Sequence, residues 1–366
     1  MRMKLKPLSE QTMVITGATS GIGLVTARQA AKRGARLMLV ARNEQALGQL
    51  SEELNGNGTE TAFVVADVGD EAQVQHAADE TVRRFGGFDT WVNNAAVSIY
   101  GRLDEVEIAD MRRLFDTNFW GYVYGSLAAV RHFRHNSRGG NGHAAGKLIN
   151  IGSVLGERSI PIQGIYSASK HAVAGFTEAL RTEAYAEHLP ISITLIKPSA
   201  IDTPYKDHAK NYLDHAPKNP PPVYEPEVVA RSVLHAAQHD LRDLVVGGGG
   251  KLITLSSSLF PVLADRVIAR VMPWLQQLDE PPKPIDENNL YGPGEDLSER
   301  SNYSWALKHS AYTRAMMYPK TTRTALLAAG LATAGLLLAR RRRKALALRR
   351  RSSLRWRAPL RRLLGN

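Results

Sequence analysis

Residues 16–23 read TGATSGIG and follow the apolar run MVIT at 13–16 without a break. The residues after Gly23, LVTARQAAKRG, have the periodicity of a helix. Glycines in a strand-to-helix turn let the backbone approach a phosphate, and the N–H groups at the helix N-terminus bind the anion. The stretch therefore predicts a nucleotide-binding βαβ unit, although its glycine spacing is GxxxGxG and not GxGxxG.

Strand and helix patterns alternate from this turn to about residue 246. The candidate strands are 13–16, 36–41, 61–65, 90–93, 147–151, 191–196 and 243–246. Nearly continuous apolar runs such as RLMLVA suit strands that are buried on both faces of a parallel sheet. We therefore expect an α/β fold, a Rossmann-like doubly wound parallel sheet with helices on both faces, followed by a helical C-terminal extension.

Composition divides the chain into three parts. Residues 1–250 form the predicted nucleotide-binding domain, which ends in the run GGGG. Residues 251–318 form an amphipathic and proline-rich extension, and residues 319–366 contain an uncharged apolar segment (324–339) and an arginine-rich tail. Within the first part, 204–225 is rich in Pro, Asn, His and Asp, and its length predicts a lid or binding loop.

The net charge of +12 belongs to the tail. Twelve of the 47 Lys and Arg residues, and none of the 35 acidic residues, lie in 340–366. The rest of the chain is neutral, so we do not expect its main domain to bind nucleic acid. The chain has no cysteine, which excludes disulfides and thiolate chemistry, and its eleven histidines lack carboxylates at convincing spacing, so we expect no metal site.

The apolar segment 324–339 has three interpretations. Its sixteen residues would form a helix of about 24 Å, somewhat short for a hydrocarbon core of about 30 Å. It could span the membrane, dip into one leaflet with the arginines on anionic headgroups, or pack as a core or oligomer-contact helix beside a solvated tail. We favour the one-leaflet anchor, because it keeps the main domain and its nucleotide on the cytoplasmic side.

A second motif supplies candidate chemistry. Tyr166 and Lys170 are four residues apart in a predicted helix and therefore share one face. A lysine ammonium near a phenol favours the phenolate and lowers its pKa from about 10, which would make Tyr166 an acid/base near neutral pH. Ser153 comes just after the strand 147–151, at the strand end where open α/β sheets place their sites.

In order and spacing, the motifs resemble the classical short-chain dehydrogenase/reductase family over roughly residues 10–250. The resemblance rests on TGATSGIG, Asp67 in VVADV, NNAA at 93–96, Asn118, Ser153, the Tyr166/Lys170 pair, and Pro198-Ser199 with Thr203. The family's usual NNAG and PG are NNAA and PS here, small changes that we expect to be tolerated. We expect the histidines to lie on the surface, and the Met316-Met317 pair to lie in the core or an interface and not in a binding site.

The resemblance implies four catalytic residues. Tyr166 would exchange a proton with the substrate oxygen, and Lys170 would lower its pKa and bind the nicotinamide ribose. Ser153 would hold the carbonyl or hydroxyl oxygen, and Asn118 would keep a water in the proton relay. The outcome would be hydride transfer between a nicotinamide cofactor and an alcohol/carbonyl pair.

The resemblance also implies the cofactor site. Three glycines would shape the pyrophosphate turn, Asp67 and Val68 would border the adenine, and Asn94 would steady the cofactor side of the sheet. The full set is Gly17, Thr19, Ser20, Gly21, Ile22, Gly23, Arg42, Asp67, Val68, Asn94, Ala95, Tyr166, Lys170, Pro198, Ser199, Ile201 and Thr203.

Cofactor choice rests on the end of the strand 36–41. A carboxylate there would pair with the ribose hydroxyls of NAD and repel a 2′-phosphate. The sequence instead continues with Arg42-Asn43, and a guanidinium can fork onto a phosphate. We therefore predict NADP in preference to NAD, with a solvated surface role for Arg42 as the alternative.

The sequence thus predicts an NADP-dependent oxidoreductase that reduces an apolar ketone or aldehyde. We expect a homodimer or homotetramer formed through helices within 103–130 and 168–186, as the resemblance implies, in the cytoplasm and attached to a membrane surface through 324–366. The rival interpretation is a non-catalytic NADP-binding scaffold or sensor, attached to a membrane or nucleic acid by its basic tail.

Overall fold

The computed structural model describes residues 3–138, 145–294, 296–301, 303, 305–319, 321, 322, 324, 327 and 333. The chain divides into two compact units, Met1–Met317 and Tyr318–Asn366. Most of the segment 324–339 and the whole arginine-rich tail lie outside the described residues, so the three interpretations of the tail stay open. In the part of the chain that is described, no helix is both long and apolar enough to cross a bilayer.

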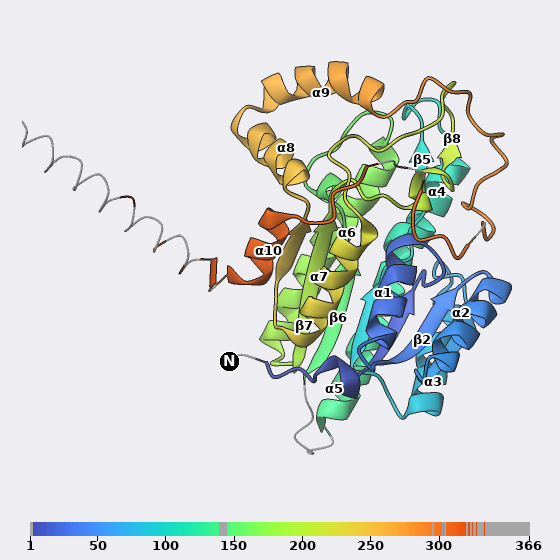
Figure 1. Cartoon of the computed structure of the whole chain (residues 1–366), viewed down its shortest axis with the longest axis vertical. Coiled ribbons are helices and arrows are strands. Elements are labelled where there is room, and N and C mark those ends of the chain that lie inside the picture. Colours follow the sequence, from blue (N-terminus) through green and yellow to red (C-terminus); the bar gives the residue numbers. More distant parts are fainter. Residues whose placement is uncertain are drawn as a thin grey trace, which may run out of the picture. The chain divides into compact units, whose positions relative to one another are not determined.

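A parallel sheet forms the centre of the first unit (Figure 1). Its strand order is β3-β2-β1-β4-β6-β7-β9. The strands are β1 (Thr12–Thr16), β2 (Arg36–Ala41), β3 (Thr61–Val65), β4 (Thr90–Asn93), β6 (Gly146–Ile151), β7 (Ile191–Pro198) and β9 (Asp243–Val246). All seven predicted strands are confirmed. The order reverses between β1 and β4, which is where doubly wound sheets open a crevice for a ligand.

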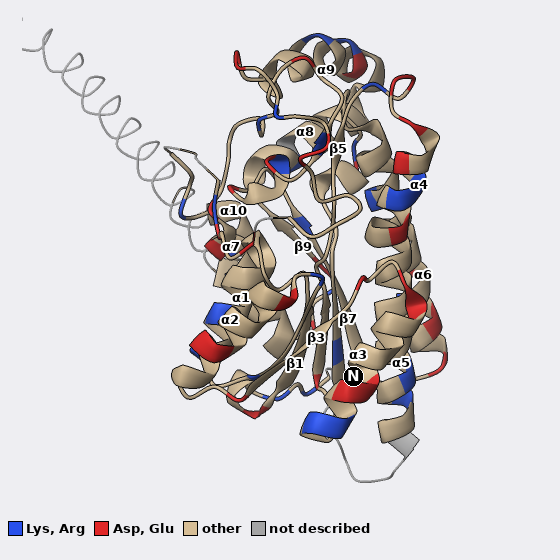
Figure 2. Cartoon of the chain, turned by 90° about the vertical axis from the view of Figure 1, so that its right-hand side faces the viewer, with Lys and Arg blue, Asp and Glu red and all other residues tan. Residues whose placement is uncertain are grey.

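Helices cover both faces of this sheet, as predicted. One face carries α1, α2 and α7, and the other carries α3, α5 and α6 (Figure 2). The helices are α1 (Gly21–Ala31), α2 (Glu44–Gly56), α3 (Glu71–Phe85), α4 (Ile108–Phe115), α5 (Gly121–Arg138), α6 (Gly164–Ala186), α7 (Pro226–Gln238), α8 (Gly248–Leu259), α9 (Pro261–Leu275) and α10 (Ala311–Met317).

The core has two layers because successive residues of each strand point to opposite faces. In β1, Met13 and Ile15 pack in the layer under α1 and α7, whereas Val14 packs in the layer under α3 and α5. All three side chains are completely buried. Burial of an aliphatic side chain contributes about 1.5–3 kcal/mol, so apolar residues are favoured at every position of such a strand.

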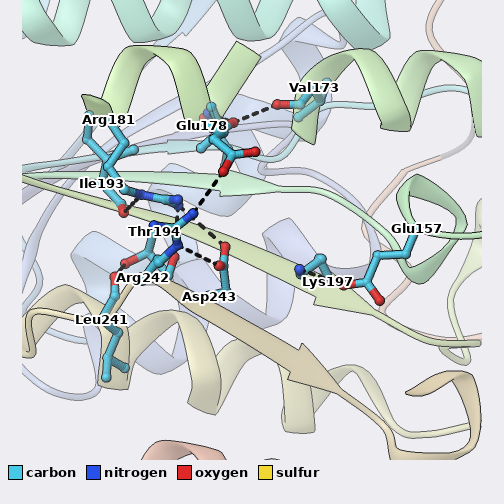
Figure 3. A network of polar contacts seen from close by, with 12 residues as sticks. Glu157, Val173, Glu178, Arg181, Ile193, Thr194, Lys197, Leu241, Arg242 and Asp243 are labelled. Carbon is cyan, nitrogen blue, oxygen red and sulfur yellow. Dashed lines mark hydrogen bonds and ion pairs between the residues drawn. The ribbon is translucent and has the colours of Figure 1, made fainter. Parts of the chain in front are cut away.

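A polar network ties α6 to the sheet (Figure 3). Arg181 on α6 is buried, and its guanidinium donates to the carbonyl of Ile193 (3.2 Å) and to that of Arg242 (3.0 Å). Arg242 in turn pairs with Glu178 of α6 (3.0 Å) and with Asp243 of β9 (3.2 Å). Because α6 also carries Tyr166 and Lys170, these contacts fix the predicted catalytic helix against β7 and β9.

Short elements complete the loops around the sheet; the first of them precedes β1 at the amino end, and the others lie near the carboxyl ends of the strands. They are the helical turns η1 (Leu8–Glu10), η2 (Asp116–Trp120), η3 (Val154–Gly156) and η4 (Pro204–Lys206), and the strands β5 (Ile99–Tyr100) and β8 (Lys210–Asn211). η2 is a π-helical turn, and β5 pairs with β8 in parallel. The pairing attaches the loop 204–225 to the segment that follows β4.

The extension is helical at 248–275 and 311–317 and packs against the rest of the first unit. α8 and α9 lie beyond the carboxyl ends of β6 and β7 (Figure 1). α10 is fixed to β9, because the Thr313 hydroxyl accepts the Gly247 N–H (3.0 Å) and donates to the Val245 carbonyl (3.4 Å). The described residues between these helices run back to the turn at 16–23, where Leu297 and Ser298 bind the backbone of Thr19 and Gly21.

Candidate active site

The turn at 16–23 needs its glycines for close contact. Gly17 has a φ of +64°, and a Cβ there would lie 2.8 Å from the Ala95 Cα. A Cβ on Gly23 would lie 2.0 Å from the carbonyl oxygen of Gly17, so α1 could not pack against the turn. Asn94 locks the arrangement by donating to the carbonyls of Thr16 (3.0 Å) and Gly17 (3.2 Å). The result is an open cradle at the N-terminus of α1, of the kind that holds a pyrophosphate.

Tyr166 and Lys170 share a face of α6, as their spacing predicts. The ammonium of Lys170 donates to the Ile151 carbonyl (3.0 Å) and to the Tyr122 hydroxyl (3.2 Å), and it lies 5.7 Å from the centre of the Tyr166 ring. The Tyr122 hydroxyl donates to the same Ile151 carbonyl (2.8 Å). The end of β6 therefore positions the lysine behind the tyrosine.

Burial dominates the titration of this pair. It raises the pKa of Tyr166 to about 12, although the neighbouring hydroxyls of Tyr205 and Ser153 lower it in part. It lowers the pKa of Lys170 to about 7. The protein alone therefore keeps the Tyr166 phenol protonated at neutral pH, in contrast to the expected lowering of its pKa by Lys170, because both side chains are removed from water.

Ser153 stands at the carboxyl end of β6 and caps η3, where its hydroxyl accepts the N–H of Leu155 (3.0 Å). Glu157 holds this loop in place, because it pairs with Lys197 of β7 (2.6 Å) and with Lys251 of α8 (3.0 Å); Figure 3 shows the first pair. Although burial acts in the opposite direction, the two lysines lower the pKa of Glu157. The loop that carries Ser153 is thus bound to both the sheet and the extension.

Asn118 is completely buried in the π-helical turn η2. Its amide accepts the N–H of Val97 (2.8 Å), and donates to the Val97 carbonyl (2.9 Å) and the Ser169 hydroxyl (3.3 Å). The side chain therefore joins the segment after β4 to α6, one turn from Tyr166. A π-helical turn inside a helix often accompanies a functional site.

The predicted site residues come together around a cavity of about 290 Å³. All of them line it except Gly23 and Asn118, which lie directly behind its wall. The cavity runs along the carboxyl ends of the strands, from Arg42 and Asp67 at one end, past the turn at 17–22, to Ser153 and Tyr166. We call the first the adenosine end and the second the catalytic end.

At the adenosine end the charged side chains are already engaged. Asp67 forms a salt bridge with Arg113 of α4, and its carboxylate also accepts the N–H of Gly69 (2.9 Å). Arg42 donates to the carbonyl of Asn289 (2.6 Å), a residue of the extension. Burial lowers the pKa of Arg42, as does the neighbouring charge of Arg113, whereas Asp67 raises it.

The sequence did not reveal every residue of the cavity. Tyr205, from the predicted lid loop, packs edge-on against Tyr166 with ring centres 5.4 Å apart. The extension adds Ile253 and Met272 at the catalytic end and Asn289 and Asp296 at the adenosine end. The length of the loop gave a signal for Tyr205, but no motif marks the residues of the extension. Within the described residues, no three potential ligand side chains form a metal-binding group.

The chain is similar to known proteins over most of its length. A family model described as short chain dehydrogenase matches residues 11–213. The uncharacterized oxidoreductase YxnA of Bacillus subtilis is 46% identical over 320 residues, which are 87% of this chain and 88% of that protein. This match is too long to end at residue 250, so it includes much of the extension. An 11-beta-hydroxysteroid dehydrogenase A of Sesamum indicum is 35% identical over 238 residues, 62% of this chain and 65% of that protein.

Solved structures have the same fold. A short chain dehydrogenase/reductase from Burkholderia phymatum in complex with NAD is 27% identical, with a TM-score of 0.51 over 71% of this chain and 86% of that chain. An alcohol dehydrogenase from Thermococcus sibiricus, complexed with 5-hydroxy-NADP, has a TM-score of 0.55 at 23% identity, over 64% of this chain and 95% of that chain. Both nicotinamide cofactors therefore occur on this fold.

Proposed function

Because the chain belongs to the short-chain dehydrogenase/reductase family, we propose that it reduces an apolar ketone or aldehyde to the alcohol with NADPH. One observation carries the proposal: the Tyr166 phenol, whose pKa is raised to about 12 by burial, lies in the same cavity as the nucleotide turn. A protonated group is suited to deliver a proton to a carbonyl oxygen. The non-catalytic scaffold has no comparable support, since a scaffold needs no buried phenol beside Ser153.

The residues that line the cavity support binding of a nicotinamide dinucleotide. A Cβ at Gly17 would collide with Ala95, so the turn requires glycine there, and the N-terminus of α1 offers N–H groups for the pyrophosphate. The adenine would lie against Asp67 and Val68, and the nicotinamide ribose beside Tyr166 and Lys170. The bound cofactor supplies hydride for the carbonyl carbon.

The chain's own residues handle the substrate oxygen. The Ser153 hydroxyl would orient the oxygen, and the Tyr166 phenol would donate its proton to it as the alcohol forms. Lys170, held by Ile151 and Tyr122, would then stabilise the phenolate that results, since an ammonium favours the charged form of its neighbour. Asn118 fixes the backbone between Val97 and α6 and would support a water in the proton relay.

The preference for NADPH rests on Arg42. Its guanidinium lines the cavity, and the strand that it follows ends without a carboxylate. Two of its nitrogens face carbonyls of the extension, Asn289 (2.6 Å) and Leu290 (3.5 Å), which orients the group while leaving it charged. A fixed guanidinium at this place favours a 2′-phosphate.

The apolar substrate is supported by the wall of the catalytic end. Leu155, Ile160, Ile253 and Met272 line it, and Ile160 and Met272 belong to one buried apolar cluster with Ile268. Such a wall binds hydrocarbon by burial, at about 25 cal/mol per Å². The test follows NADPH absorbance with a series of aldehydes and ketones of rising chain length. We expect kcat/KM to rise with chain length, and turnover that is absent for the whole series would overturn the proposal.

We also propose that residues 324–366 attach the chain to an anionic membrane surface on the cytoplasmic side. Support comes from the sequence of the tail. It also comes from α8, α9 and the residue between them, where Leu259, Phe260, Leu263 and Trp274 are more than 60% exposed. The full chain should sediment with phosphatidylserine vesicles, and a chain ending at residue 318 should not. A full chain that stays in the supernatant would contradict this, and DNA binding lost on the same truncation would assign the tail to nucleic acid.

The predicted homodimer or homotetramer has a candidate surface on α4 to α6. Large apolar side chains are exposed there at Ile108 (62%), Trp120 (45%) and Tyr185 (56%). We propose that this face is the subunit interface. Light scattering of the purified protein should give a multiple of the 40.2 kDa chain mass, and Trp120→Lys should shift it towards the monomer.

A further inference from the structure

Part of the extension lies directly on the nucleotide turn. We call residues 289–294 and 296–301 the strap. The N–H of Leu297 donates to the carbonyl of Thr19 (2.7 Å), and the carbonyl of Ser298 accepts the N–H of Gly21 (3.0 Å). These are backbone contacts with the very turn that the cofactor must approach. The strap is thus built into the wall of the cavity at its adenosine end.

Side chains of the main domain hold the strap on both sides of this contact. Leu290 is completely buried, and its carbonyl accepts from Arg113 (3.1 Å), the partner of Asp67. Further along, Glu299 pairs with Arg28 of α1 (2.7 Å), and the N–H of Ser301 donates to Asp202 (3.1 Å). These contacts hold the strap against the main domain at both of its ends.

One side chain of the strap brings a carboxyl group to the adenosine end. Asp296 lines the cavity together with Arg42, Asn43 and Thr19. Thr19 and Asn43 lie within hydrogen-bonding range of its carboxyl group, and the nearby charges are those of Arg42 and His208. Asn43 is fixed here because its Oδ1 caps α2 (3.0 Å from the Ala46 nitrogen), while its Nδ2 donates to Gly294 of the strap (3.4 Å).

Arg42 and Asp296 face the same space without neutralising each other. Each charge influences the pKa of the other group, yet no salt bridge joins the two in the described part of the chain. Arg42 instead donates to the Asn289 carbonyl. A cation and an anion are thus both presented to whatever occupies this end of the cavity.

We propose that Asp296 is a specificity-determining residue of the cofactor site, which opposes Arg42 at the 2′ position of the adenosine ribose. Its carboxylate accepts hydrogen bonds from free ribose hydroxyls and repels a 2′-phosphate, whereas Arg42 attracts the phosphate. The β2 strand lacks the carboxylate that selects NAD, and the strap supplies one from the far end of the first unit. The chain therefore binds both NADPH and NADH, with a preference for NADPH that Asp296 limits. This inference rests on the proposed nicotinamide site, but not on turnover.

The test uses fragments that contain only the adenosine end of each cofactor. Kd values for 2′,5′-ADP and for ADP are measured by calorimetry on the full chain and on D296N, R42Q and E299Q. Asp296→Asn keeps the size of the side chain and removes its charge. Glu299→Gln makes the same change on the strap but outside the cavity, where Glu299 pairs with Arg28, and serves as the matched control.

We expect D296N to shift the Kd ratio towards 2′,5′-ADP by about tenfold, which corresponds to about 1.4 kcal/mol. R42Q should shift it in the opposite direction, and E299Q should leave it unchanged. A ratio in D296N equal to that of the natural chain would overturn the inference, as would an equal loss of affinity for both fragments, which indicates a structural role only. Because binding alone is measured, an absence of carbonyl turnover would contradict the proposed function and leave this result standing.

Discussion

The catalytic end and the adenosine end of the cavity are built in different ways. At the catalytic end, β6 and α6 supply Ser153, Tyr166 and Lys170, which lie within eighteen positions of one another in the sequence. At the adenosine end, the turn after β1 meets the strap. The proposed catalytic residues therefore belong to the family's own framework, whereas part of the wall of the proposed cofactor site comes from the extension.

The largest effect should come from the catalytic end. Tyr166→Phe removes the proton donor and keeps the ring that packs on Tyr205, so kcat should fall by about 10²–10⁴-fold. The Kd of NADPH should stay within about twofold, since the phenol contributes little to dinucleotide binding compared with the rest of the cavity. Steady-state rates give kcat, and a fluorescence titration gives the Kd of NADPH. Full activity of Y166F would remove Tyr166 from the mechanism.

The next largest effect should come from Leu290, a buried residue of the strap. Leu290 is completely buried, so Leu290→Ala should lower the free energy of unfolding by about 2–5 kcal/mol. It should also lower the affinity for NADPH and for NADH by the same factor. Ile285→Ala, at a side chain that is 43% exposed, is the matched control and should change neither. Urea unfolding and cofactor titration of the same samples make the measurement. An unchanged stability of L290A would show that the strap is not packed as described.

Arg42→Gln should act on one cofactor alone. Loss of the guanidinium removes the partner of the 2′-phosphate, so the KM for NADPH should rise by about tenfold while that for NADH changes little. Initial rates with the two cofactors and one saturating aldehyde provide the comparison. Equal changes for both would show that Arg42 serves only to hold the Asn289 carbonyl.

The two ends should also differ in the pH dependence of stability. Burial lowers the pKa of Lys170 from 10.5 to about 7. Between pH 7 and pH 10.5 Lys170 is therefore more protonated in the unfolded chain than in the folded one, so the free energy of unfolding should rise with pH in this range. Burial raises the pKa of Asp296 above 3.8, so the unfolded chain ionises first and stability should fall as pH rises through that region. Urea unfolding from pH 3 to 10 measures both effects. Lys170→Met should remove the rise of the free energy of unfolding above pH 7, and Asp296→Asn should remove the fall in the acidic range.

The sequence predicted the catalytic end, and the nucleotide turn itself, because the elements of both are local. The run MVIT before TGATSGIG, and the YxxxK spacing on a helix, each fix a strand end or a helix face within a few residues. All seven strands follow from nearly continuous apolar runs, because a strand buried on both faces admits little else.

The adenosine end was not predictable in the same way. Asp296 lies in a polar segment without periodicity, and its position depends on contacts with Thr19 and Gly21, which are far away in the sequence. Arg42 was assigned to a phosphate from the end of its strand alone, and nothing local indicates the carbonyl of Asn289 beside it. Burial of the Tyr166/Lys170 pair also outweighs the charge effect expected from their spacing. Tertiary contacts decide each of these points.

The central claim is that the nucleotide turn and the strap form one cofactor site. Amide hydrogen exchange of the full chain, with and without saturating NADPH, tests it most directly, because the Leu297 N–H and the Gly21 N–H are both hydrogen-bonded across the contact. We predict that NADPH slows exchange in 16–23 and in the strap together. Slower exchange in 16–23 with no change in the strap would contradict the account.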